Sequence, residues 1–156
     1  MEKTCCVTGH RIIPPEQTGC LLQCLEAAIE QALTQGFSRF ISGYAEGVDL
    51  LFAELVIRAR ERHPGITLEA ALPYRARLAR LRQSQSTKAL IAAAEKVYIA
   101  CEAYSPSSFH IRNHYMVAES ARIIAVHDGR ATGGTAATLR YAQAKGKDIQ
   151  EILLEP

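Results

Sequence analysis

Three short segments of this sequence combine glycine with hydroxyl, basic or acidic side chains at the end of an apolar run. They are Thr8-Gly9-His10-Arg11, the segment from Ser42 to Asp49, and Gly133-Gly134-Thr135. Glycine allows a positive φ or a close backbone approach, and a helix that starts after such a turn presents free N–H groups to an anion. One such turn is as typical of an ordinary loop as of a phosphate site. Three turns of one kind favour a shared phosphate site.

The third segment is the best candidate for phosphate binding. Gly133 and Gly134 let an anion approach the helix N-terminus, and Thr135 adds a hydroxyl donor there. The segment is not a P-loop, because the lysine of G-x-x-x-x-G-K-[ST] is absent. Gly43-x-x-x-Gly47 also lacks the G-x-G-x-x-G spacing of a dinucleotide fingerprint. The pattern therefore predicts phosphate binding by backbone groups outside the standard motifs.

Three carboxylates are candidates for catalysis. Asp49 has two open interpretations, a helix N-cap or a carboxylate for a ribose hydroxyl. Glu46 and Asp49 could form an acid/base pair, although Glu46 is also typical of a solvated loop carboxylate. Asp128 qualifies only if its loop faces inward. The sequence contains no Ser-His-Asp order and no metal-ligand spacing that stands out, so we expect no metal.

Basic and amide side chains near these turns supply the expected counter-charge. His10 and Arg11 belong to the first turn, and Arg112 and Asn113 stand at the start of a later helix that can reach the same rim. Arg112 is the expected partner of an anion, whereas a histidine such as His10 is more often structural than catalytic. The residues placed at the ligand site are Thr8, Gly9, His10, Arg11, Ser42, Gly43, Gly47, Asp49, Arg112, Asn113, Asp128, Gly133, Gly134 and Thr135.

The elements that must position these residues alternate between strands and helices. Apolar runs predict strands over residues 4–8, 39–42, 66–72, 96–101, 122–126 and 148–154. Helical periodicity predicts helices over residues 14–36, 49–63, 75–82, 89–94, 105–120 and 133–146. This alternation predicts an α/β fold, a single Rossmann-like domain over residues 1–156 with a mostly parallel, doubly wound sheet and helices on both faces. Ligands of such sheets bind at the C-terminal ends of the strands.

Composition limits the partners. The chain has 156 residues, 18 Lys and Arg against 16 Asp and Glu, and a formal charge of +2, which is too balanced to indicate nucleic acid or a membrane. No charged leader with an apolar stretch and no long apolar run occurs, so we expect a cytoplasmic protein. Five cysteines without a C-x-x-C pair suit core thiols in a reducing compartment, and a metal pair at Cys20 and Cys24 is the less favoured interpretation.

The only basic cluster consists of Arg75, Arg77, Arg80 and Arg82. On a helix these side chains would point largely toward solvent, and this is the favoured interpretation. Contact with phosphate or with a nucleic-acid single strand is the alternative. We call these four residues the arginine cluster.

With these residues in view, the chain resembles the SLOG superfamily, which joins the Smf/DprA DNA-processing proteins to the LOG cytokinin-activating hydrolases. The resemblance covers nearly the whole length. Ile41-Ser42-Gly43-x-Ala45-x-Gly47-Val48-Asp49 is similar to the S-G-x-A-x-G-[IV]-D loop of DprA proteins. The segments that look like the small bacterial YpsA/YoqJ-like branch are Cys5 to Arg11, Arg112-Asn113-x-x-Met116-Val117, and Asp128-Gly129 with Gly133 to Ala136 and Arg140 to Ala142.

The resemblance implies a Rossmann-like fold whose glycine loops bind a nucleotide or a nucleotide-derived ligand. One departure concerns catalysis: LOG hydrolases carry P-G-G-x-G-T-x-x-E, whereas Thr132 precedes the glycine pair here and the spacing is shortened. Thr138 occupies the place three after Thr135 where the glutamate would fall. DprA proteins are longer and use basic surfaces for single-stranded DNA, for which only the arginine cluster is available here.

The leading hypothesis is a sensor or regulator that binds an adenosine nucleotide, ADP-ribose or an NAD-like compound. The alternatives are a LOG-like N-glycosidic hydrolase and, less favoured, a DprA-like module for single-stranded DNA. The expected partner is a small-molecule nucleotide, no membrane partner is expected, and a homodimer is compatible because domains of this kind often pair through helices.

Overall fold

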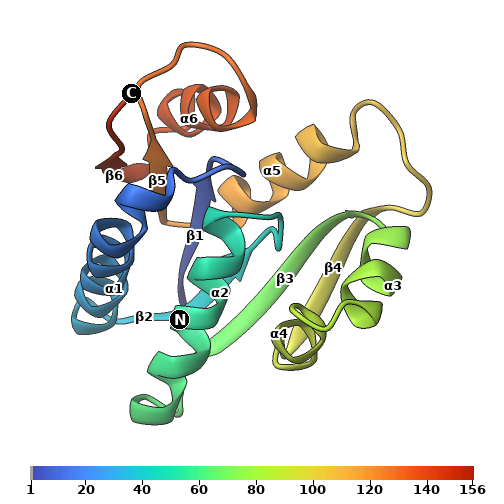
Figure 1. Ribbon diagram of the computed structural model, residues 1–156, viewed down its shortest axis with the longest axis horizontal. Helices are drawn as coiled ribbons and strands as arrows, with labels where there is room; N and C mark the ends of the chain where they lie inside the picture. The colour runs from blue at the N-terminus through green and yellow to red at the C-terminus, as the bar shows by residue number, and fades with distance from the viewer. Residues whose placement is uncertain (1) are drawn as a thin grey trace.

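A computed structural model describes residues 2–156, and a single sheet runs through its centre (Figure 1). The six strands are all parallel and lie in the order β4-β3-β2-β1-β5-β6. The strands are β1 (Lys3–Gly9), β2 (Phe37–Ser42), β3 (Thr67–Tyr74), β4 (Lys96–Cys101), β5 (Arg122–His127) and β6 (Asp148–Leu153). The α/β Rossmann-like architecture predicted from the sequence is therefore confirmed, with a sheet that is fully rather than mostly parallel.

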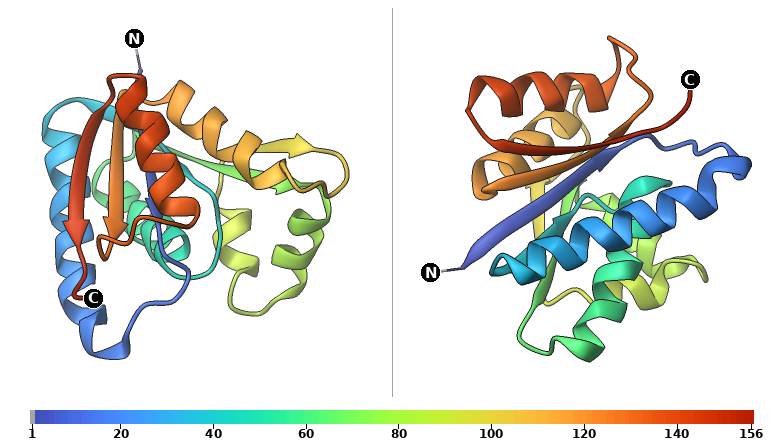
Figure 2. Two further views of the ribbon diagram at one scale, coloured as in Figure 1. Left: turned by 90° about the horizontal axis from the view of Figure 1, so that it is seen from above. Right: turned by 90° about the vertical axis from the view of Figure 1, so that its left-hand side faces the viewer.

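Helices cover both faces of the sheet. They are α1 (Thr18–Thr34), α2 (Val48–Arg62), α3 (Ala76–Gln83), α4 (Lys88–Ala92), α5 (Ser108–Glu119) and α6 (Gly134–Ala144), and a 3-10 turn, η1 (Pro15–Gln17), precedes α1. Figure 2 shows α1 and α2 on one side of the sheet and α5 and α6 on the other. The right-handed crossovers of a parallel sheet require helices on both sides in this way.

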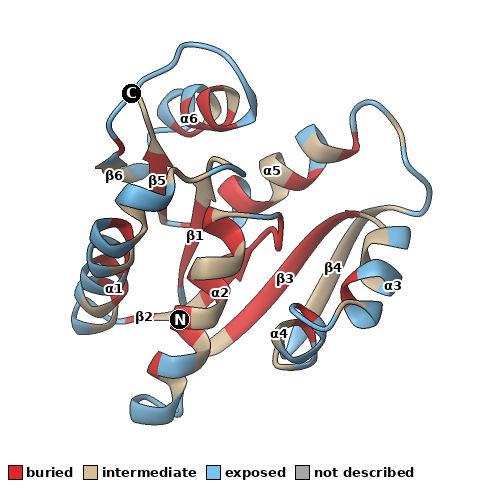
Figure 3. Ribbon diagram, viewed as in Figure 1, coloured by how far each residue is buried: buried red, intermediate tan, exposed pale blue. Residues whose placement is uncertain are grey.

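Two hydrophobic cores hold the layers together (Figure 3). The larger core joins the sheet to α1, α2, α3 and α4, with Phe40, Phe52 and Leu68 fully buried. The smaller core joins the opposite face to α5 and α6 through residues such as Met116 and Ala142. These apolar contacts fix the helices that carry the polar groups of the site, because close-packed cores resist displacement.

The strand order changes direction between β1 and β5. The chain first builds outward from β1 to β4, then returns to the other side of β1 with β5 and β6. In open α/β sheets such a switch point leaves a crevice at the C-terminal ends of the two central strands. The loops after β1, β2 and β5 all reach this edge, because the three strands are parallel neighbours.

Two details differ from the sequence-based expectations. Cys5 and Cys6 are buried as expected of core thiols, but Cys20 and Cys24 are exposed, because Leu21, Leu25 and Ala28 form the buried face of α1. The helix predicted from Pro14 begins with a 3-10 turn and becomes α-helical at Thr18. Within residues 2–156, none of the helices is both long and apolar enough to traverse a lipid bilayer.

Candidate functional site

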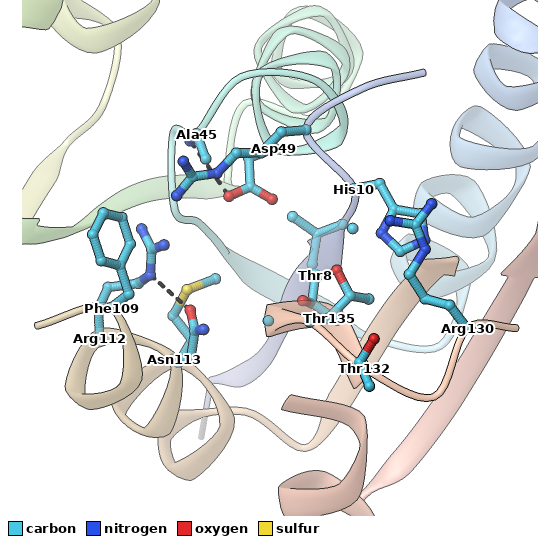
Figure 4. A pocket seen from close by; sticks show the side chains of 16 residues that line it. Thr8, His10, Ala45, Asp49, Phe109, Arg112, Asn113, Arg130, Thr132 and Thr135 are labelled. Carbon is cyan, nitrogen blue, oxygen red and sulfur yellow. Dashed lines mark hydrogen bonds between the residues drawn. The ribbon is translucent and has the colours of Figure 1, made fainter. Parts of the chain in front are cut away.

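A cavity of about 240 Å³ lies at the C-terminal edge of the sheet, where β1, the loop after β2, α5 and the start of α6 meet. We call it the main cavity. Figure 4 shows Phe109, Arg112 and Asn113 on one side of it, His10 and Arg130 on the other, and Thr8 and Thr135 between them. The sequence-predicted residues that line it are Thr8, Gly9, His10, Arg11, Asp49, Arg112, Asn113, Gly133, Gly134 and Thr135. Ser42, Gly43, Glu46, Gly47 and Asp128 do not line it.

The first two glycine turns interlock at the floor of the site. A Cβ on Gly9 would lie 2.5 Å from Cβ of Val48, and a Cβ on Gly47 would lie 2.5 Å from the carbonyl oxygens of His10 and Arg11. Gly47 also adopts a φ of 83°, which L side chains rarely accept. The His10 carbonyl accepts a hydrogen bond from the Val48 amide at 3.2 Å. These glycines therefore serve close packing between the two loops.

Gly43 lets two opposite charges approach the loop after β2. A Cβ at this position would lie 2.6 Å from Nη1 of Arg112 and 2.7 Å from Oδ2 of Asp49. Positive φ is instead adopted by the next residue, Tyr44 at 55°, whose buried hydroxyl donates to the Leu90 carbonyl at 2.8 Å. The loop conformation thus places Asp49 and Arg112 against the same glycine.

Asp49 is a buried carboxyl group in the wall of the main cavity. It lies in the first turn of α2, where its Oδ2 accepts a hydrogen bond from the Ala45 amide at 3.4 Å, so the N-cap interpretation is wrong. Gly47 holds the N-cap position instead. Burial raises the pKa of Asp49 to about 6, although Arg112, the Ala45 amide and Arg11 act in the opposite direction. A carboxyl group with such a pKa exchanges its proton near neutral pH.

Arg112 is a buried cation that links the loop after β2 to strand β3. Its Nη1 donates to the carbonyl oxygens of Gly43 at 2.9 Å and Ala71 at 3.1 Å, and its Nε donates to Oδ1 of Asn113 at 2.7 Å. Within residues 2–156 its Nη2 donates to no protein group. Burial lowers the pKa of Arg112 and Asp49 opposes that effect, yet an arginine stays charged in proteins. The free donor makes Arg112 a candidate anion ligand.

The start of α6 offers backbone donors to the same cavity. Gly133 is the N-cap with a φ of 101°, and a Cβ on Gly133 or Gly134 would meet no atom within 4 Å. The first amide groups of a helix have no intrahelical acceptor, and the helix dipole favours negative charge there. This opening leaves room for an anion, and anion binding at the start of α6 stays a prediction.

His10, Asp128 and Arg130 form a polar cluster at the far end of the main cavity. Nε2 of His10 lies 3.2 Å from Oδ1 of Asp128, and the Arg130 guanidinium binds both oxygens of the same carboxylate. The hydrogen bonds from Arg130 hold the pKa of Asp128 well below its usual range. Asp128 is therefore poorly suited to donate a proton, and it positions the two basic side chains instead.

Glu46 and Asp49, weighed as an acid/base pair against a solvated Glu46, do not share the cavity. Glu46 is exposed and lies outside the main cavity, whereas Asp49 is buried within its wall. Ser42 is fully buried, and its hydroxyl donates to the Asp49 carbonyl at 2.8 Å. Ser42 thus supports the loop, and Asp49 is the one carboxylate among the described residues that line the main cavity.

Comparisons with known proteins agree with this architecture. The family model described as the YspA SLOG family matches residues 14–154. The chain belongs to this family. The resemblance drawn from the sequence is confirmed, and the edge where the glycine turns meet is part of a SLOG fold.

Two solved structures share the fold of this SLOG chain. One is the X-ray structure of TM1055, a structural genomics target, with a TM-score of 0.59 and 17% identity over 94% of this chain and 72% of that one. The other is DNA processing protein A from Helicobacter pylori, described for its single-stranded DNA binding mode, with a TM-score of 0.70 and 17% identity. This chain is 98% covered in that comparison and spans 66% of the length of the Helicobacter pylori protein. No curated protein sequence matches the chain.

Sequence reasoning did not assign several residues that line the main cavity. Two cations lie near the Phe109 ring, with Cζ of Arg11 at 5.1 Å and Cζ of Arg112 at 5.7 Å from its centroid. The sequence signal that could have identified Phe109 is an aromatic residue at the start of α5, close to Arg112 and Asn113. Arg130 and Thr132 also line the cavity, and both lie in the loop between Asp128 and the glycine pair.

The arginine cluster lies mostly on α3, outside the main cavity. Arg75 precedes the helix and makes two hydrogen bonds to Glu102, at 2.6 and 2.9 Å. Arg80 and Arg82 are exposed, and Leu81 provides the buried contact of the helix. The solvent-facing arrangement favoured from the sequence agrees with this exposure.

Proposed function

We propose that the protein binds a nucleotide or a nucleotide-derived ligand, such as an adenosine nucleotide, ADP-ribose or an NAD-like compound, and acts as a sensor or regulator. The observation that carries this proposal is the main cavity itself. There a glycine-capped helix N-terminus and the buried cation Arg112 face the same space. Both attract a phosphate.

Each part of a nucleotide finds a complementary group along the cavity. The phosphate fits the start of α6, where Gly133 and Gly134 leave room and the amides are free. Phe109 offers a ring face for a base, since bases stack on aromatic side chains. Asp49 is placed between these ends and can accept a hydrogen bond from a ribose hydroxyl.

The described residues fit ligand binding better than glycoside hydrolysis. Hydrolysis of a glycosidic bond commonly uses two carboxyl groups, one on each side of the bond. Asp49 is the one carboxylate among the described residues that line the main cavity, and Asp128 is held by hydrogen bonds from Arg130. Thr138, which stands where LOG hydrolases carry a glutamate, donates its hydroxyl to the Gly134 carbonyl at 2.9 Å. The proposal therefore expects binding without turnover.

One observation favours the hydrolase as the second candidate. The pKa of Asp49, raised to about 6 by burial, suits a general acid at neutral pH. Chromatographic detection of free base after incubation with adenosine monophosphate, or with its N6-modified forms, tests this candidate. Base release by the wild type that disappears in Asp49→Asn would replace the sensor proposal with an enzyme.

A matched pair of variants tests the binding proposal. Gly134→Asp places a carboxylate at the start of α6, where it repels a phosphate and satisfies the free amides. Gly65→Asp makes the same chemical change near the opposite edge of the sheet, and a Cβ on either glycine meets no atom within 4 Å. Calorimetric titration with adenosine nucleotides, ADP-ribose and NAD should show binding to wild type and Gly65→Asp, and none to Gly134→Asp. Equal affinity of all three folded proteins would exclude this turn from the site.

The same samples address self-association. The proposal is also compatible with a homodimer, besides the nucleotide partner. Light scattering with and without ligand measures whether a second copy takes part in binding.

A further inference from the structure

A second cavity adjoins the main cavity across a boundary of basic side chains. It measures about 490 Å³, and three residues line both cavities: His10, Arg11 and Arg130. The main cavity, at about 240 Å³, falls below the range of about 300 to 1,000 Å³ that is usual for small-molecule pockets. The combined volume of the two cavities, which share this wall, falls inside that range. The space available to a ligand therefore extends beyond the groups of the main cavity.

The second cavity differs in chemistry from the main cavity. Its walls come from the segment between β1 and α1 and from the C-terminal residues after β6, and its apolar members are Ile12, Ile13, Pro14, Pro15, Leu154 and Pro156. Ile12 is 86% exposed, the most exposed of the large hydrophobic side chains among residues 2–156. Prolines keep this wall rigid, because their φ angle is fixed. An apolar group seated here would bury surface that is otherwise in contact with water.

The boundary between the cavities carries two cations, Arg11 and Arg130, against the single carboxylate of Asp128, which also lines the second cavity. Asp128 binds both His10 and Arg130, so these two side chains are fixed beside the opening. Arg11, the third boundary residue, is exposed and lies next to Ile12 in the chain. Figure 4 shows His10 and Arg130 on the opposite side of the main cavity from Phe109 and Arg112. A phosphate chain that leaves the start of α6 would pass this boundary on its way to the second cavity.

We propose that the ligand is a nucleoside diphosphate that carries an apolar group on its outer phosphate. The nucleoside occupies the main cavity, the outer phosphate lies at His10 and Arg130, and the apolar group packs against Ile12 in the second cavity. This inference rests on the proposed nucleotide binding, and it names the class of ligand for that site.

Two synthetic esters of adenosine diphosphate, the methyl and the benzyl ester, test the inference by calorimetry. They carry equal charge and differ by a phenyl ring. Burial of a ring of this size is expected to make the benzyl ester bind about tenfold to a hundredfold more tightly than the methyl ester. Unesterified adenosine diphosphate serves as the reference for binding to the main cavity alone.

A pair of variants locates the ring. Ile12→Glu should remove the advantage of the benzyl ester over the methyl ester, a ratio from which the repulsion between the added carboxylate and the equally charged phosphates cancels. Leu153→Glu makes the same change at a side chain that is 70% exposed and lines neither cavity, so it should keep the advantage. Both positions are exposed, and neither change is expected to unfold the protein.

The outcomes separate the inference from the proposed function. Equal affinity of the two esters, with adenosine diphosphate still bound, would overturn the inference and leave nucleotide binding in place. An advantage of the benzyl ester that survives in Ile12→Glu would also overturn it, because the ring would then lie elsewhere. Failure of adenosine diphosphate and both esters to bind would refute the proposed function and the inference together.

Discussion

The buried carboxyl group of Asp49 makes the stability of the protein depend on pH. Its pKa is raised from 3.8 to about 6, chiefly by burial, so the folded protein binds this proton more tightly than the unfolded chain. The stabilisation is therefore fully present below about pH 4 and is lost as the pH rises through about 6. At about 1.4 kcal/mol per pKa unit, the rise from 3.8 to about 6 corresponds to a loss of about 3 kcal/mol.

The substitution Asp49→Asn isolates this contribution. The asparagine of the variant does not titrate, and neither does Arg112 in this range, so this position contributes no pH dependence to the stability of the variant. The free energy of unfolding of wild type relative to Asp49→Asn should therefore fall by about 2.5 kcal/mol between about pH 4 and about pH 7.5.

Urea unfolding followed by circular dichroism at several pH values measures this difference. Glu46→Gln is the matched control, since it removes an exposed carboxylate of the same loop and reports the general effect of losing one negative charge. Curves for wild type and Asp49→Asn that stay parallel from pH 4 to pH 7.5 would refute the reasoning, because they would mean that folding does not change the proton affinity of Asp49.

Two further predictions concern the loop after β2 and the arginine cluster. Gly43→Ala would place a methyl group 2.6 Å from Nη1 of Arg112 and 2.7 Å from Oδ2 of Asp49. It should lower the free energy of unfolding by about 1 to 3 kcal/mol. In the control Gly65→Ala the methyl group meets no atom within 4 Å, so the free energy of unfolding should change by less than about 0.5 kcal/mol. Denaturant titration of both variants checks this, and equal stability would show that the loop yields. If the protein binds single-stranded DNA, exchange of the four arginines of the cluster for glutamine should weaken binding. The slope of the logarithm of the affinity against the logarithm of the salt concentration should then become less steep by about 0.7 per lost phosphate contact. Fluorescence anisotropy with a labelled strand decides this, and no binding by the wild type at low salt removes the DNA alternative.

The position of the glycine turns could be predicted from the sequence. Apolar runs and helical periodicity indicate alternating strands and helices, and parallel strands bring the turns that follow them to one edge. Gly9 and Gly134 line one cavity for this reason, and Gly43 lies behind its wall. Local patterns were sufficient because each turn depends on the strand that immediately precedes it.

The contacts among the charged groups could not be predicted in the same way. Arg112 binds the carbonyl of Gly43, 69 positions earlier in the chain, and His10 meets Asp128 across 118 positions. Such pairs depend on how helices pack on the sheet, and periodicity does not specify that packing. For the same reason the sequence left two interpretations of Asp49 open, a helix N-cap and a carboxylate for a ribose hydroxyl, and did not reveal that this carboxyl group is buried.

Nuclear magnetic resonance of the isotope-labelled protein during titration with adenosine diphosphate tests the central claim most directly. The backbone amide signals of the turn after β1 and of the start of α6 should shift together as the nucleotide is added, because both line the main cavity. The amides of Gly65 and of the arginine cluster should stay in place, since they lie outside it. Saturable shifts confined to another surface, or no shifts at millimolar nucleotide, would contradict the account.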